Sequence, residues 1–190
     1  MKGFFFGSFD PPHVGHINVV TTALNSGIVD KVEVIPAFKS VWKNTETRWE
    51  YRLMTCKSSF NSIPGVSVNP VEYILANENP LPTYKVIDYL KETEKDNFVI
   101  IMTPETFDEL PRWIEGDRIL EENEFIIVNS RHFGDNRDEL FDPKGNTVIF
   151  SPDIQICSTR IREKIKNGKL VEPFVTEEVS TLIRMLKLYK

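Results

Sequence analysis

The chain reads Gly7-Ser8-Phe9-Asp10-Pro11-Pro12-His13-Val14-Gly15-His16 just after a short apolar run at residues 3–6. Beyond this stretch, Ile17, Val20, Leu24 and Ile28 recur at helical spacing. An apolar run followed by a Gly/Pro-framed loop and an amphipathic segment predicts a buried strand, a tight turn and a helix. That unit is the building block of parallel α/β folds.

The same alternation continues along the chain. Strands are predicted at residues 31–36, 66–68, 98–102, 125–128 and 148–150, and helices at 47–60, 83–94, 158–167 and from 176 onward. Thr47 followed by Glu50 is a capping-box pattern at the start of the second helix. The order predicts an α/β fold, a Rossmann-like parallel sheet with helices on both faces. Ligands of such sheets bind at the carboxyl ends of the strands, so the strand-to-helix loops should carry the site.

Length and charge restrict the classes of function. A chain of 190 residues fits one domain, 1–190, with a helical C-terminal part at about 158–190. The net charge of −5 argues against nucleic acid as a partner, because non-specific binding needs extended positive surface. Residues 160–169 nevertheless hold five basic side chains against one acid. This cluster suits a compact anion such as phosphate, although charge alone favours a solvated helix face.

Cysteine usage and hydropathy indicate a compartment. Cys56 and Cys157 lie far apart without metal-type spacing, which suggests free thiols in a reducing environment. No run approaches 18 apolar residues, so the sequence predicts no membrane span. We expect a cytoplasmic protein.

The loop at residues 7–16 has the chemistry of an anion site. Gly7 permits a tight turn, and Gly15 lets a phosphate approach the backbone. His13 and His16 lie three residues apart at the opening of a helix, where free N–H groups and the helix dipole favour anions. Two incidental histidines, or a zinc site, are the alternatives. Zinc has little support because no cysteine or third histidine stands in a suitable context, and we expect no protein metal site.

This loop resembles the H-x-G-H signature of a nucleotidyltransferase superfamily, in the G-[ST]-F-D-P-x-H-x-G-H form of nicotinate and nicotinamide mononucleotide adenylyltransferases. A second stretch, residues 156–162, resembles the I-S-x-T-x-[IL]-R motif of that family, with Cys157 in place of a serine. The resemblance implies that His16, His13 and Arg162 are catalytic. It also implies that ATP is bound by Gly7, Ser8, Phe9, His13, Gly15, His16, Ser158, Thr159 and Arg162.

Further matches imply a site for the second substrate. Trp113 stands in the family's P-x-W motif and would stack on a pyridine ring, although it could equally be a packing residue. Thr83 and Tyr84 resemble a segment that holds nicotinate. Thr103 and Glu105 replace a usual G-x-D, which changes the contacts expected there. Lys43 and Arg131 also match family positions, and the C-terminal residues 186–189 are similar to the family's G-L-Y.

The activity implied by the resemblance is transfer of an adenylyl group from ATP to nicotinate or nicotinamide mononucleotide. The products would be deamido-NAD or NAD and pyrophosphate, in NAD biosynthesis, with Mg²⁺ carried by the co-substrate ATP and small molecules as partners. Two alternatives stay open. One is a related enzyme such as a pantetheine-phosphate adenylyltransferase or a cytidylyltransferase, and the other is a nucleotide-sensing domain without turnover. The sequence indicates neither the pyridine preference nor the oligomeric state.

Overall fold

The computed structural model describes residues 1–39, 45–131, 146–152 and 154–190. Its centre is a parallel sheet with the strand order β3-β2-β1-β4-β5-β6. The strands are β1 (Lys2–Gly7), β2 (Lys31–Pro36), β3 (Val66–Val68), β4 (Phe98–Met102), β5 (Phe125–Arg131) and β6 (Thr147–Pro152). This confirms the predicted α/β class, with strand boundaries that differ from the predicted ones by at most three residues.

The strand order fixes where a ligand can bind. From β1 the chain adds β2 and β3 on one side, and it then crosses over to add β4, β5 and β6 on the other. The direction of winding therefore reverses between β1 and β4. In doubly wound sheets, the crevice at such a switch point, outside the carboxyl ends of the strands, is where ligands bind. The loop after β1 lies at that point.

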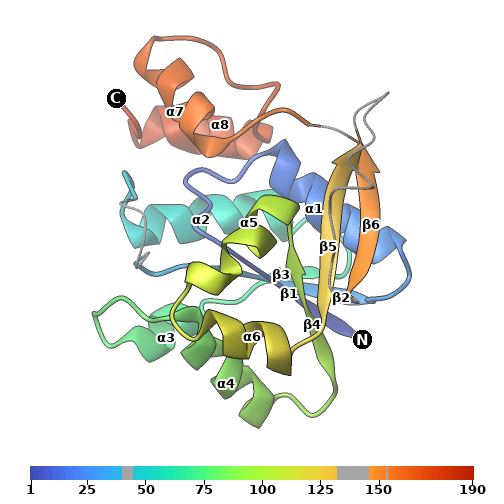
Figure 1. The fold of residues 1–190 in the computed structure, drawn as a ribbon. Coiled ribbons are helices and arrows are strands. Elements are labelled where there is room, and N and C mark those ends of the chain that lie inside the picture. The colour runs from blue at the N-terminus through green and yellow to red at the C-terminus, as the bar shows by residue number, and fades with distance from the viewer. Residues whose placement is uncertain (40–44, 132–145, 153) are drawn as a thin grey trace.

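Helices cover both faces of the sheet (Figure 1). The first face packs against α1 (Val14–Asn25) and α2 (Trp49–Phe60), and the second against α4 (Thr83–Thr93) and its neighbours. Successive residues of a strand point to opposite faces. Accordingly Phe5 joins the core with Val20 and Cys56, whereas Phe4 joins the core with Val86. The remaining elements on the second side are α3 (Val71–Ala76), α5 (Pro104–Glu109), the 3₁₀ turn η1 (Leu110–Arg112) and α6 (Gly116–Glu122).

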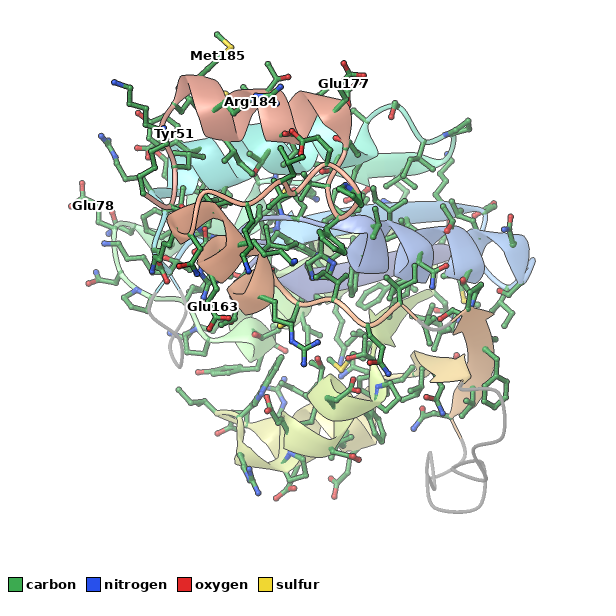
Figure 2. The ribbon with its side chains drawn as sticks, turned by 90° about the horizontal axis from the view of Figure 1, so that it is seen from above. Tyr51, Glu78, Glu163, Glu177, Arg184 and Met185 are labelled. Carbon is green, nitrogen blue, oxygen red and sulfur yellow. The ribbon has the colours of Figure 1, made fainter. Side chains whose placement is uncertain are left out.

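The C-terminal part is helical, as predicted, with α7 (Ser158–Lys166) and α8 (Glu177–Met185). In Figure 1 these two helices lie beyond α1 and α2, on the side away from α3, α4 and α6. They share a small core that includes Ile161 and Val179, and Tyr51 of α2 packs against it. Glu177 and Met185 project from the outer side of α8 in Figure 2. The two C-terminal helices thus pack on the rest of the fold partly through α2.

Two expectations about helices were wrong. The capping box at Thr47 does not form, because α2 begins at Trp49 and its N-cap, Arg48, makes no side-chain cap bond. The short helices α3, α5 and α6 were missed. Helices of six or seven residues span too few turns for a clear apolar period. Within the described ranges, no helix has the length and apolar character needed to cross a bilayer.

Candidate functional site: a histidine-capped loop beneath a cationic helix

The two histidines of the first loop cap helix α1, because each ring accepts a hydrogen bond from a backbone N–H at the start of the helix. The Nδ1 atom of His13, the N-cap residue, accepts from the N–H of Gly15 at 3.1 Å. The Nδ1 atom of His16 accepts from the N–H of His13 at 3.2 Å. The two rings stack with their centroids 3.7 Å apart. This arrangement is a capping box built from imidazoles rather than from the usual hydroxyl and carboxylate.

The caps also decide which ring nitrogen can donate. Because Nδ1 of each ring accepts a hydrogen bond, a neutral ring must carry its proton on Nε2. Burial lowers the pKa of His13 to about 4. Burial, and then the charge of His13, lower the pKa of His16 well below its usual range. Both rings are therefore neutral near pH 7, and each offers one Nε2–H donor to a ligand.

Packing explains the two glycines of the motif. A Cβ at Gly7 would stand 2.8 Å from the ring of Phe9, and a Cβ at Gly15 would stand 3.0 Å from the ring of His13. Gly7 was expected to serve a tight turn, whereas neither glycine adopts positive φ. Phe9 does, with φ of 47°, and its buried ring stacks edge-on against His16. The buried ring of Phe9 therefore packs against His16, and only the backbone of Phe9 can reach a ligand.

The start of α7 docks directly on this loop. Ser158 Oγ donates to the carbonyl of Pro11 at 2.9 Å, and Arg162 Nη1 donates to the carbonyl of Asp10 at 2.8 Å. Arg162 Nη2 also lies 3.3 Å from Thr159 Oγ1. The first turn of α7 has free backbone N–H groups as every helix does, and its N-cap, Cys157, makes no side-chain cap bond. The two sequence motifs thus converge on one side of the loop.

A buried carboxylate connects the loop to the C-terminus. Asp10 Oδ1 accepts from the hydroxyl of Tyr189 at 2.8 Å, and Asp10 Oδ2 accepts from the N–H of Glu46 at 2.7 Å. Burial raises the pKa of the Tyr189 phenol, so it remains a donor. The tail that resembles the family's C-terminal motif therefore holds the loop in place.

The carboxylate of Glu46 forms ion pairs with two cations of α7. Its Oε1 lies 3.1 Å from Arg162 Nε and its Oε2 lies 2.8 Å from Lys166 Nζ. The cations of Lys166 and Arg162 hold the pKa of Glu46 below its usual value, against the effect of burial. A phosphate that binds Arg162 must compete with this contact.

A cavity of about 410 Å³ opens beside the loop, at the carboxyl ends of β1 and β2. Among the residues predicted to bind a ligand, Gly7, Ser8, Thr83 and Trp113 line it. Half-buried Trp113 also packs against the core of the second face. Thus the same residue serves both packing and the cavity wall.

Other predicted contacts lie elsewhere. Tyr84 packs in the core of the second face, with Arg118 over its ring at 5.9 Å. Thr103 Oγ1 lies 3.3 Å from Thr106 Oγ1, and Thr106 lines the cavity in its place. Glu105 is exposed and is not a lining residue. Lys43 lies outside the described residues, as does the side chain of Arg131 at the end of β5.

Three residues that sequence reasoning did not single out belong to this site. Arg112 and Glu72 line the cavity, and Arg52 lies buried behind it. Burial raises the pKa of Glu72 to about 7, partly opposed by the N–H of Phe38. The position of Arg112 next to Trp113 was a usable signal. Arg52 and Glu72 gave no such signal, because they lie far from either motif along the sequence.

The described residues contain no cluster of three histidine, cysteine, aspartate or glutamate side chains that could hold a metal ion. Asp10, the acid nearest in sequence to the histidines, has an oxygen bonded to Tyr189 and another bonded to Glu46. These donors do not fit a resident cation.

A doubly wound sheet with a histidine-capped loop and a cationic helix at its switch point defines a nucleotide-binding protein of the nucleotidyltransferase type. Residues 4–164 match the cytidylyltransferase-like family. A probable nicotinate-nucleotide adenylyltransferase of a Thermotoga species is 30% identical over 182 residues, which cover 93% of this chain and 91% of that protein. The corresponding protein of Gemmatimonas aurantiaca is 27% identical over 195 residues, covering 99% and 92%.

The fold has a solved counterpart. The nicotinic acid mononucleotide adenylyltransferase of Plasmodium falciparum, in complex with NaAD, superposes with a TM-score of 0.81 at 19% identity, covering 99% of this chain and 96% of that one. The chain belongs to the cytidylyltransferase-like family and, within it, to the nicotinate-nucleotide adenylyltransferases. It is therefore an enzyme, a nucleotidyltransferase.

Proposed function

We propose that the chain joins ATP to nicotinate mononucleotide, giving deamido-NAD and pyrophosphate, as a step of NAD biosynthesis. The observation that carries this proposal is the hydrogen bonding of Ser158 and Arg162 to the carbonyls of the loop that ends in His13. One triphosphate can reach both groups because the loop and the helix are in direct contact. The names of the relatives favour nicotinate over nicotinamide as the pyridine.

The reaction is an in-line displacement at the α-phosphorus of ATP. An oxygen of the mononucleotide 5′-phosphate forms the new bond, and the bond to the β-phosphate oxygen breaks, releasing pyrophosphate. The nucleophile is already an anion, so no general base is needed, and catalysis consists of positioning and charge stabilisation. His16 donates from Nε2 to the reacting α-phosphate.

The leaving pyrophosphate is held by the remaining groups. His13 donates from its Nε2, Ser158 and Thr159 contribute free N–H groups of α7, Thr159 adds its hydroxyl, and Arg162 contributes its guanidinium. Neutral imidazoles suit this role, because each keeps its Nε2–H donor across the physiological pH range. Mg²⁺ would enter bound to ATP, and the described residues provide no further ligand set for it.

The acceptor would occupy the cavity that Trp113 and Thr83 line. Stacking of an electron-poor pyridine on the indole ring of Trp113 is a favourable aromatic contact. The adjoining loop carries Gly7 and Ser8, so the acceptor phosphate would face the ATP site. In this arrangement nucleophile and electrophile would lie on the two sides of one loop.

The test is product identification. The protein is incubated with ATP, Mg²⁺ and, separately, nicotinate mononucleotide, nicotinamide mononucleotide or pantetheine phosphate. In a parallel series CTP replaces ATP with acceptors of cytidylyltransferases, and all products are identified by mass. We expect deamido-NAD and one pyrophosphate per turnover from nicotinate mononucleotide. If only another acceptor gave a product, the chain would have the activity of a related nucleotidyltransferase. ATP binding without pyrophosphate release would instead indicate a nucleotide sensor.

A further inference from the structure

Arg52 is a buried cation that lies between the two strand ends that form the site. It comes from the first turn of α2, and only 1% of its surface is exposed. Burial lowers its pKa, opposed first by the charge of Asp10. A buried guanidinium is retained only where its donors are satisfied, so its partners indicate what it does.

Those partners are backbone carbonyls. Nη1 donates to Ser8 at 2.9 Å and to Ala37 at 2.6 Å, and Nη2 donates to Phe38 at 2.6 Å. Nε donates to Thr47 at 3.3 Å. Ser8 follows β1 and Ala37 follows β2, and both line the cavity. One planar group therefore ties together the ends of two strands.

Two side chains bind the backbone of Phe38. Its carbonyl accepts from Arg52, and its N–H donates to Glu72 Oε1 at 2.8 Å. Glu72 comes from α3 on the opposite face of the sheet, and 3% of its surface is exposed. Both side chains thus bind the backbone just after β2, where the chain forms part of the cavity wall.

The two strand ends differ in what else holds them. The loop after β1 is also fixed by Ser158, Arg162 and Tyr189. In the described part of the chain, the side-chain bonds to residues 37 and 38 come from Arg52 and Glu72. Loss of Arg52 should therefore release the β2 end more than the loop that binds phosphate.

We propose that Arg52 is a positioning residue, whose guanidinium sets the spacing between the phosphate loop and the wall of the acceptor cavity and so aligns the two substrates. The proposal rests on the proposed function for its kinetic consequence. Its structural part does not depend on that function. A displacement of about 1 Å between reacting groups can cost about a hundredfold in rate.

The test compares Arg52→Lys, which keeps the charge but loses the planar fork, with Arg48→Lys. Arg48 lies one turn earlier and is exposed, and it forms an ion pair with Glu50. We expect kcat of the Arg52 variant to fall about 10- to 100-fold and KM for the mononucleotide to rise. ATP binding measured by calorimetry should change less than about threefold, because α7 still holds the phosphate loop. The Arg48 variant should match wild type in all three.

Hydrogen exchange provides a readout that does not need turnover. Exchange of the Ala37 and Phe38 amides should accelerate in Arg52→Lys, while that of the Gly15 amide in the loop stays as in wild type. Unchanged exchange at residues 37 and 38 would overturn the proposal, and so would an unchanged kcat. If the wild-type protein makes no dinucleotide, the exchange experiment still decides the positioning role, so the two failures are distinguishable.

A second pair of variants applies if Arg52→Lys does not fold. Glu72→Gln keeps an oxygen that can accept from the N–H of Phe38, and Glu72→Ala does not. We expect kcat and Phe38 protection to fall at least tenfold further in the alanine variant than in the glutamine variant. Equal losses in both would contradict the positioning role of this contact.

Discussion

Substitution of His16 separates its two roles, because one ring nitrogen caps the helix and the other can donate to phosphate. In His16→Asn, the amide oxygen stands near the position of Nδ1 and can still accept from the N–H of His13, which is 3.2 Å from Nδ1 in wild type. The Nε2 donor is lost. In His16→Ala, the cap acceptor and the Nε2 donor are lost together.

The magnitudes follow from the two contacts. Removal of one donor to a developing phosphate charge costs about 3–4 kcal/mol of transition-state stabilisation, or a 100- to 1000-fold lower kcat. Loss of the cap leaves the N–H of His13 without its acceptor and costs about 1–2 kcal/mol of the free energy of unfolding. We therefore expect His16→Asn to keep its stability and lose turnover.

The assay is steady-state pyrophosphate release at saturating ATP and mononucleotide, with urea unfolding of the same preparations. His16→Ala should show both losses together. A His16→Asn variant that turns over at close to the wild-type rate would refute the assignment of the Nε2 donor to the reaction. Equal stability of the Asn and Ala variants would refute the capping role.

Three further predictions concern Arg162, Trp113 and Glu72. Arg162→Ala should lower kcat/KM for ATP about 10- to 100-fold, and Arg160→Ala, an exposed cation of the same helix, should leave it unchanged; equal effects would mean that only the charge of α7 matters. Trp113→Ala should raise KM for the mononucleotide about 3- to 10-fold at constant KM for ATP, with Trp113→Phe in between. The pKa of Glu72, raised from 4.5 to about 7, means that the folded state holds this proton more tightly than the unfolded state. The free energy of unfolding should therefore fall between pH 4.5 and 7, by up to about 3 kcal/mol, relative to Glu72→Gln at each pH; parallel curves for the two proteins would show that the carboxyl titrates normally.

The sequence could predict the sheet and the two phosphate motifs because both depend on local pattern. Buried strands such as Phe98–Met102 are continuous apolar runs, and the two motifs lie directly after a strand and at a helix start. Spacing also placed His13 and His16 at the opening of α1. Their mutual capping could not be read from spacing, since it depends on the orientation of two rings within a reciprocal hydrogen-bond pair.

The contacts that hold the site in place could not be predicted from the sequence, for a different reason. Arg52 binds carbonyls of residues that the chain brings together only after β1 and β2 have paired. Gly7 is explained by the ring of Phe9 two residues further on, where a turn was the natural interpretation. Contacts of this kind follow from tertiary packing, and no local pattern encodes them.

The central claim is that imidazoles from the start of α1 and the cationic start of α7 bind one triphosphate. A crystal structure with a non-hydrolysable α,β-methylene analogue of ATP tests it most directly. We expect one triphosphate within hydrogen-bond distance of Nε2 of His13 and of His16, of the N–H groups at Ser158 and Thr159, and of Arg162, with Glu46 displaced from that guanidinium. A triphosphate that contacts only one of the two elements, while Glu46 stays bound to Arg162, would contradict it.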